Sequence, residues 1–206
     1  MARITGGIGT GISGKLEQLV FVQRGGKTYV RMAPDYSNTS WSVKQKMHRE
    51  RFRKVNAFCR QFRTTVIRTI WKALPGPSSG YAKFLKANMP AFSSNGELAD
   101  YTRLHFSDGV LPLPFNMKAS RVPGTQQVEV SWTNDPLMDF GLGYDKLMIA
   151  TYDGKQFTVN VDTGLTRKMG QGIIVLPAFE DGKSFLYLYF ASADMLRFSP
   201  DVCFTL

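Results

Sequence analysis

The stretch QVEVSWT, residues 127–133, decides the fold class of this 206-residue chain. Val128, Val130 and Trp132 alternate with polar residues. A period of two is typical of a strand with one face on a core and the other in water. The stretch therefore predicts a half-buried strand of an antiparallel sheet.

Other strand-like runs lie on both sides of this stretch at short intervals. FLYLYFA, residues 185–191, would place apolar or aromatic residues on both faces of a strand, which predicts a central strand covered on both faces. An early Trp and a late run of Tyr suggest an immunoglobulin- or fibronectin-like sandwich. We predict strands at 116–121, 127–133, 146–152, 156–160, 172–176, 184–193 and 201–206, with turns at Pro123-Gly124, Asn134-Asp135-Pro136, Asp153-Gly154 and Asp181-Gly182.

The preceding part of the chain has a helical period. Residues 42–74 contain neither Gly nor Pro, Ser42 and Gln45 fit a capping box, and Thr64-Thr65 predicts a break into two helices. A second helix is expected at 81–88, and a strand at 101–106. The apolar positions recur at steps of three and four and predict one buried face: Phe52, Val55, Cys59, Phe62, Val66, Ile70 and Leu74.

The N-terminal part reads GISGKLEQLVFVQRGGKTYVRM over residues 11–32. Two extended runs, 16–23 and 27–32, flank Gly25-Gly26, and this pair predicts a hairpin turn because both residues accept a positive φ. Gly9, Gly14 and Lys15 also fit the start of a phosphate-binding loop. However, Leu16 replaces the Ser or Thr that would ligate magnesium, and a strand follows instead of a helix. Neither a nucleotide nor any other cofactor is expected.

The whole chain is therefore predicted to be an α+β protein, with an N-terminal β-hairpin and basic helical segment before a C-terminal antiparallel β-sandwich. The predicted domains are a basic arm, hairpin and helical module at 1–90, a linker or edge strand at 91–115, and the sandwich at 116–206. The net charge is +10, but residues 1–90 carry +14 and residues 91–206 carry −4. The basic part should therefore seek a polyanion or an acidic protein surface.

Little in the sequence indicates catalysis. The chain has two His and two Cys residues, and it lacks a nucleophile elbow, so no enzyme activity is expected. Cys59 and Cys203 are interpreted as structural residues. The carboxylates of Asp135, Asp139, Asp145 and Asp153 lie in turn contexts, and we expect turn chemistry there in preference to a calcium site.

The N-terminal part and the helix start resemble an uncharacterised domain family found mainly in Bacteroidota. The resemblance is carried by Gly-Ile-Ser-Gly-Lys-Leu at 11–16, by Ala33-Pro34, and by Trp132-Thr133-Asn134 in the later half. Ser42, Gln45, Arg49 and Phe52 match the family's helix pattern, with Ser in place of Thr. The family's function is unknown, so the resemblance implies a two-part architecture and no catalytic residues.

The function predicted from the sequence is that of a non-enzymatic structural or interaction protein. We expect a subunit or accessory of a larger assembly, phage-like or secretion-related, that docks on an acidic protein surface; non-sequence-specific nucleic-acid binding is the alternative. Cytoplasmic synthesis without a signal peptide and no membrane span are expected, with incorporation into a particle as one outcome. The predicted docking residues are Lys15, Arg24, Lys27, Arg31, Arg49, Arg53 and Lys54.

Overall fold

The computed structural model describes residues 2–4, 11–35, 40–137, 139–176 and 184–206. Gly9 and the predicted turn at Asp181-Gly182 lie outside the described residues. The contacts divide the chain into two compact units, Met1–Ser42 and Val43–Leu206. Each unit is described by itself.

The first unit is a four-stranded antiparallel sheet in the order β1-β4-β3-β2. Its strands are β1 Ala2–Ile4, β2 Gly14–Leu16, β3 Leu19–Arg24 and β4 Lys27–Met32. Gly25 and Gly26 form the β3–β4 turn with φ of 57° and 71°, so the predicted hairpin is confirmed. Both angles lie in the left-handed region, where glycine has no steric penalty.

The predicted single strand over 16–23 is wrong, because the chain reverses within it. Glu17 and Gln18 form a turn, and Leu16 at the end of β2 pairs directly with Leu19 at the start of β3. Glu17 adopts φ 49°, a conformation that usually calls for Gly or Asn. Since the turn lacks these residues, the local sequence does not signal it.

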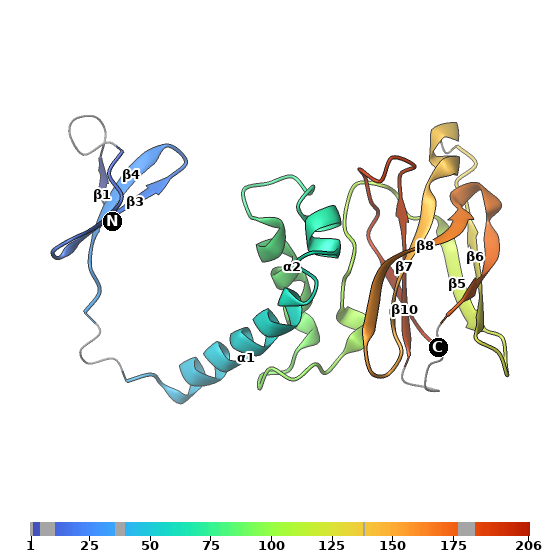
Figure 1. Ribbon diagram of the computed structural model, residues 1–206, viewed down its shortest axis with the longest axis horizontal. Helices are drawn as coiled ribbons and strands as arrows, with labels where there is room; N and C mark the ends of the chain where they lie inside the picture. The colour runs from blue at the N-terminus through green and yellow to red at the C-terminus, as the bar shows by residue number, and fades with distance from the viewer. Residues whose placement is uncertain (1, 5–10, 36–39, 138, 177–183) are drawn as a thin grey trace. The chain divides into compact units, whose positions relative to one another are not determined.

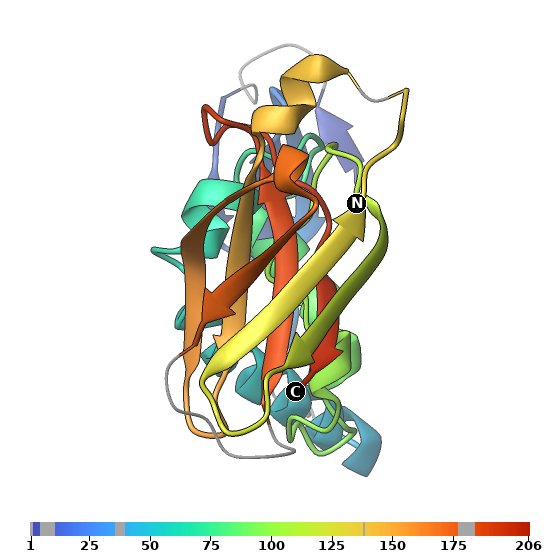
Figure 2. The ribbon, with the colours of Figure 1, turned by 90° about the vertical axis from the view of Figure 1, so that its right-hand side faces the viewer.

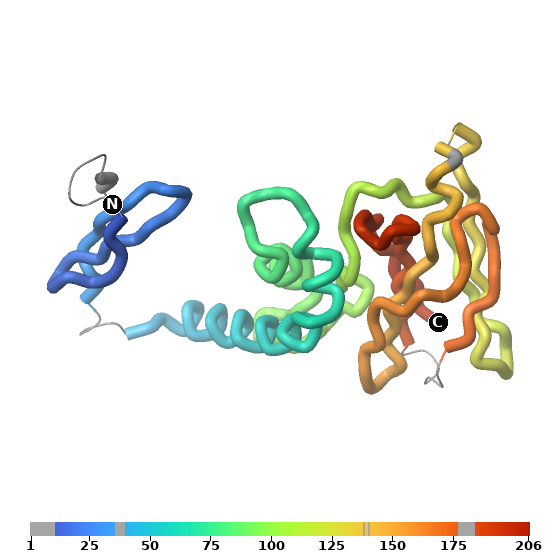
Figure 3. The backbone as a smooth tube through the Cα atoms, turned by 45° about the horizontal axis from the view of Figure 1, so that its top comes forward, coloured from blue at the N-terminus to red at the C-terminus, as the bar shows by residue number. Residues whose placement is uncertain are grey.

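The helical part of the second unit begins with α1, Val43–Arg60, directly after Ser42 as predicted. Residues 61–65 are turns and lead into the π-helical η1, Ile67–Trp71, so the predicted break at Thr64-Thr65 is confirmed. The predicted apolar face is buried from Val55 to Ile70, Leu74 at its end is partly buried, and Phe52 at its start is exposed. Figure 3 shows the backbone path from α1 through η1 to α2, Gly80–Asn88, and on to the short helices η2 Met89–Ala91 and η3 Tyr101–Arg103.

Two antiparallel sheets form the rest of the unit. One has the order β5-β6-β9 and the other β11-β10-β7-β8, with η4 Phe140–Tyr144 and η5 Arg167–Met169 in the connections. The strands are β5 Phe115–Arg121, β6 Gln127–Thr133, β7 Lys146–Tyr152, β8 Phe157–Thr166, β9 Gln171–Val175, β10 Phe185–Ala191 and β11 Val202–Thr205. All seven predicted strands of this half are present. β8 is longer than predicted, because bulges carry it through the turn-like residues 160–164.

The second unit has three layers, with helices on one face of the four-stranded sheet and the three-stranded sheet on the other (Figures 1 and 2). Val128, Val130 and Trp132 of β6 pack between the two sheets, as their alternation predicts. The central strand β10 is buried on both sides. Leu186, Leu188 and Phe190 face the three-stranded sheet, whereas Tyr187 and Tyr189 share a core with the helices.

The predicted strand at 101–106 is wrong. Tyr101–Arg103 is a 3₁₀ turn that begins at Asp100, whose carboxylate accepts a hydrogen bond from the backbone N of Thr102 at 3.0 Å. Leu104 and Phe106 are buried in the core between the helices and the four-stranded sheet. Their apolar alternation comes from packing between layers and not from strand pairing.

The contacts do not divide the chain near residue 90, the predicted end of the first domain. Val55, Cys59, Phe62 and Ile70 of the helical part share one core with the four-stranded sheet. Segment 91–115 contributes buried side chains to the same unit, and before β5 begins at Phe115 its strand pairing consists of an isolated bridge between Phe92 and Leu98. The helices and both sheets therefore form a single unit.

Candidate functional site

Four of the predicted docking residues lie on one face of the N-terminal sheet. Directly paired residues of antiparallel strands point to the same side of a sheet. Lys15 pairs with Val20, which pairs in turn with Arg31, and Arg24 pairs with Lys27 at the hairpin end. The four cationic side chains are exposed. We call this set, Lys15, Arg24, Lys27 and Arg31, the basic face.

The opposite side of the same sheet is apolar. It carries Leu16, Leu19, Phe21, Val30 and Met32, which we call the apolar face. Leu16 is 65% exposed and Met32 62% exposed. The side with the basic residues also carries Val20, Val22 and Tyr29, so charge is confined to one side of the sheet whereas apolar residues lie on both. An uncharged, exposed apolar side is typical of a sheet that packs this side on a neighbour.

The first unit has almost no interior over residues 11–35 and 40–42. Within these ranges only Thr28 is buried, and its hydroxyl accepts a hydrogen bond from the backbone N of Gly11 at 3.2 Å. Both buried apolar clusters consist of residues from the second unit. A chain segment of about 40 residues usually needs a disulfide, a metal or a partner surface to be stable.

The other three predicted docking residues lie on α1 in the second unit. Arg53 bonds Glu50 with Nε–Oε2 at 2.9 Å, and this contact lowers the pKa of Glu50. Lys54 forms an ion pair with Glu97, 43 residues further along the chain. Arg49 is exposed one helical turn before Arg53. The seven predicted residues thus fall in two units, and Arg53 and Lys54 on α1 have acidic partners within the chain.

Lys15 does not lie in a phosphate-loop conformation. Gly14 and Lys15 belong to β2, and the residues after them turn into the antiparallel strand β3. A phosphate loop requires the backbone N–H groups of a helix start after the lysine. The geometry around Lys15 therefore supports a role as a surface charge.

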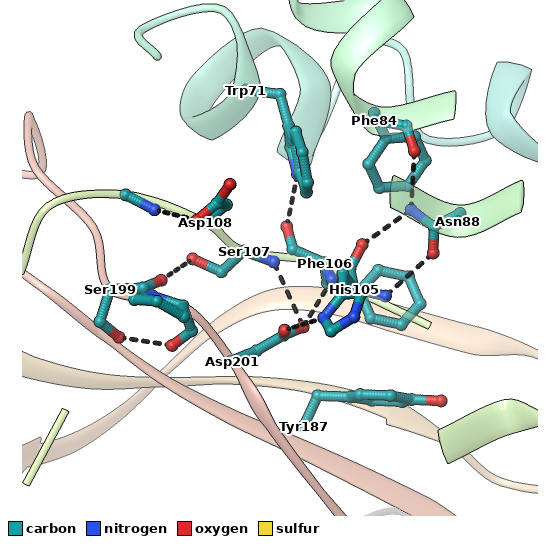
Figure 4. A network of polar contacts seen from close by, with 12 residues as sticks. Trp71, Phe84, Asn88, His105, Phe106, Ser107, Asp108, Tyr187, Ser199 and Asp201 are labelled. Atoms are coloured by element: carbon teal, nitrogen blue, oxygen red, sulfur yellow. Dashed lines mark hydrogen bonds and ion pairs between the residues drawn. The ribbon is translucent and has the colours of Figure 1, made fainter. Parts of the chain in front are cut away.

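A second polar constellation was not predicted from the sequence (Figure 4). Asp201, whose side chain is 1% exposed, accepts hydrogen bonds from the backbone N of Phe106 at 2.6 Å and of Ser107 at 3.3 Å. Its other oxygen lies 2.9 Å from Nδ1 of His105. Since 96 residues separate His105 from Asp201, no local pattern could have indicated the pair.

Two further side chains hold the same segment. Asn88 binds both backbone groups of His105: its Oδ1 accepts from the N at 2.9 Å and its Nδ2 donates to the O at 2.9 Å. Nε1 of Trp71 donates to the O of Phe106 at 2.9 Å. Side chains from η1, from α2 and from the residue before β11 thus satisfy the backbone polar groups around His105 and fix the position of its imidazole.

A His–Asp pair can support acid–base catalysis, but the described residues place no nucleophile beside it. The hydroxyl of Ser107 donates to the O of Ser199 at 2.6 Å and is buried. Burial raises the pKa of both thiols, Cys59 and Cys203, to about 12, so neither forms a thiolate readily. No group of three His, Cys, Asp or Glu residues in the described part of the chain could hold a metal ion.

Three of the aspartates considered as calcium ligands instead accept hydrogen bonds from the backbone of their own loops. Their carboxylates accept hydrogen bonds of 2.8–3.0 Å from nearby backbone N–H groups. Asp135 accepts one from Leu137, Asp139 accepts one from Gly141, and Asp153 accepts one each from Lys155 and Gln156. These contacts are the expected turn chemistry. Asp145 is different, because it is buried against Arg167.

The stability of the protein should depend on pH through His105. Its hydrogen bond to Asp201 raises the pKa of His105 despite partial burial. A raised folded-state pKa gives stability that is complete below the unfolded value of about 6.5 and is lost as the pH rises through the folded value. We expect urea denaturation at a series of pH values to show that the free energy of unfolding declines as the pH rises. In His105→Gln this decline should be smaller. An unchanged decline in His105→Gln would contradict the assignment. Half of the side chain is exposed, so solvent screening limits the size of the effect.

None of the helices in the described ranges is long and apolar enough to cross a membrane. No protein-family model matches the sequence, and no curated protein is significantly similar to it. The resemblance carried by residues 11–16 and by the start of α1 therefore stays a prediction.

Proposed function

We propose that the chain is a non-enzymatic structural or interaction protein that docks through its N-terminal sheet on an acidic protein surface. The observation that carries the proposal is the two-sided sheet of the first unit. Its four basic residues lie on one side, the apolar face opposite carries no charged residue, and residues 11–35 enclose almost no core. A partner that covers this sheet would supply the apolar burial that the unit lacks.

The basic face would select the partner, and the apolar face would contribute most of the binding free energy. Exposed charges chiefly guide encounter and exclude like-charged surfaces, whereas buried apolar area contributes about 25 cal/mol per Å². We further propose that the two sheets of the second unit form an immunoglobulin- or fibronectin-like scaffold. In this proposal the protein is a subunit or accessory of a larger assembly.

Neutralising the basic face should weaken docking. The test is a native pull-down at two salt concentrations that compares Lys15→Gln/Lys27→Gln/Arg31→Gln with the wild type. Three exposed charge pairs of about 0.2–1 kcal/mol each predict a loss of about 3- to 150-fold in affinity. The triple variant Lys72→Gln/Lys118→Gln/Lys155→Gln removes the same charge from exposed positions of the second unit and should bind as the wild type does.

Nucleic-acid binding is the competing outcome of the same experiment. If the basic face neutralises phosphates, DNA affinity should fall steeply with salt. The basic-face variant should then reduce the slope of log affinity against log salt by about one for each phosphate that it no longer neutralises. Such a slope would replace the protein-docking proposal. Equal recovery of a partner by both triple variants would also contradict it.

A further inference from the structure

An open surface pocket of about 640 Å³, called the cavity below, lies between the end of η1, helix α2 and segment 105–110. Its lining residues all belong to the second unit. Its walls are largely apolar and include Trp71, Leu74 and Val110. The volume falls in the range of about 300–1,000 Å³ that is usual for small-molecule sites.

Cationic groups line one part of this cavity. Lys83 and Lys86 lie three residues apart on α2, which places them on the same side of the helix, and the imidazole of the neighbouring His105 is paired with Asp201. Lys83 donates a hydrogen bond to the O of Leu74, a neutral group that leaves its positive charge uncompensated. Asp108 is the one acidic residue in the lining, and its Oδ1 accepts from the backbone N of Gly109 at 2.8 Å.

The cavity is built before any ligand enters. The segment with His105 is held by Asn88, Asp201 and Trp71, as described above (Figure 4). A Cβ at Gly80 would lie only 2.6 Å from the backbone N of Lys72, so α2 begins in close backbone contact with the end of η1. A rigid concavity costs a ligand little reorganisation.

We propose that this cavity binds a small organic acid with an apolar body, such as an acyl or aryl carboxylate or a sulfonate. The apolar part lies against Trp71, Leu74 and Val110, and the acid group lies beside Lys83 and Lys86. Each methylene that reaches the apolar wall should strengthen binding about 3- to 4-fold. The two ammonium groups should distinguish an acid from an uncharged molecule of the same shape.

Fluorescence titration of the full chain with anilinonaphthalene sulfonate tests the site, with uncharged phenylnaphthylamine as the parallel probe. We expect saturable binding of the sulfonate that Lys83→Gln/Lys86→Gln weakens about tenfold, with little change for the amine. Val110→Glu places an opposing charge at a 72% exposed position and should also weaken only the sulfonate. Lys72→Gln/Lys118→Gln is the matched control and should bind both probes as the wild type does.

Competition then defines the ligand class. Hexanoate should displace the sulfonate, whereas acetate and inorganic phosphate should not. Unchanged sulfonate binding in both cavity variants would overturn the site. Equal loss of both probes in the double lysine variant, or displacement by phosphate as strong as that by hexanoate, would overturn the assignment to an apolar acid. Far-UV circular dichroism verifies that each variant is folded.

Discussion

Asp145→Ala is expected to lower the free energy of unfolding by about 3–5 kcal/mol, because it leaves a buried guanidinium without its carboxylate. Oδ2 of Asp145 lies 3.2 Å from Nε of Arg167, and each side chain is at most 3% exposed. Burial raises the pKa of Asp145 and lowers that of Arg167. The raised pKa of the carboxyl and the lowered pKa of the guanidinium both mean that desolvation outweighs the attraction between the two charges. Loss of one partner therefore leaves a buried charge unpaired and destabilises the fold.

The Arg167 backbone also ties the two sheets together. Its N donates to the O of Asp145 at 2.8 Å, and its O accepts from Trp132 Nε1 at 2.8 Å and from Asn134 Nδ2 at 2.9 Å. The guanidinium lies 4.3 Å from the ring centroid of Phe190. These contacts keep Arg167 in place after Asp145 is removed, so it cannot move into water.

Thermal denaturation tests the prediction. In a unit of this size, each kcal/mol of lost stability should lower the melting temperature by about 2–4 °C. Lys146→Gln is the control, because its ion pair with Asp162 is about 40% exposed on each side and should contribute less than about 1 kcal/mol. Asp145→Ala/Arg167→Met should recover part of the loss, since no unpaired charge remains. A midpoint for Asp145→Ala equal to that of Lys146→Gln would contradict the prediction.

Phe106→Ala is expected to cost about 3–5 kcal/mol and to melt the helices and sheets together. The ring is fully buried and packs edge-on against Tyr187 of β10 at 4.8 Å and against Phe62 at 5.4 Å. It also lies 5.5 Å from Phe157 of β8. Removal of this side chain leaves a cavity where the helical layer meets the four-stranded sheet.

Circular dichroism at helix-sensitive and near-ultraviolet wavelengths, followed through urea unfolding, tests this prediction. The two signals should change together and at lower urea than in the wild type. Phe115→Ala is the matched control, because Phe115 is 57% exposed and its loss should change stability by less than about 1 kcal/mol. Loss of the helical signal before the near-ultraviolet signal, which reports aromatic packing, would favour the domain boundary near residue 90 that the sequence predicts.

Strand and helix faces were predictable wherever a local period is strong. Val128, Val130 and Trp132 point into the space between the sheets, as alternation requires, and β10 is covered on both sides. The Gly25-Gly26 turn was also predictable, because a positive φ at two successive residues favours glycine. The turn at Glu17-Gln18 and the 3₁₀ turn at Tyr101–Arg103 were not, since tertiary contacts override weak local preferences there.

The candidate sites also divide into features that the sequence predicts and features that only the tertiary structure shows. The basic residues of the N-terminal part could be read from composition, but their placement on one face depends on which residues pair across the strands. The partners of Lys54 and Arg51 were not foreseen: Glu97 and the carbonyl groups of Met89 and Phe92 lie some 40 residues away. The cavity beside Lys83 was missed as well, because its walls come from three separate segments.

The sequence alone determined the α+β class, most of the strands and the positive charge of the first half. These properties depend on periodicity, turn chemistry and composition, which act over a few residues. Only the tertiary structure decided that α1 and α2 share a core with β7 and β10, and that His105 pairs with Asp201. The physical reason is that burial and low-dielectric pairing depend on segments brought together by the whole fold, and no local stretch encodes them.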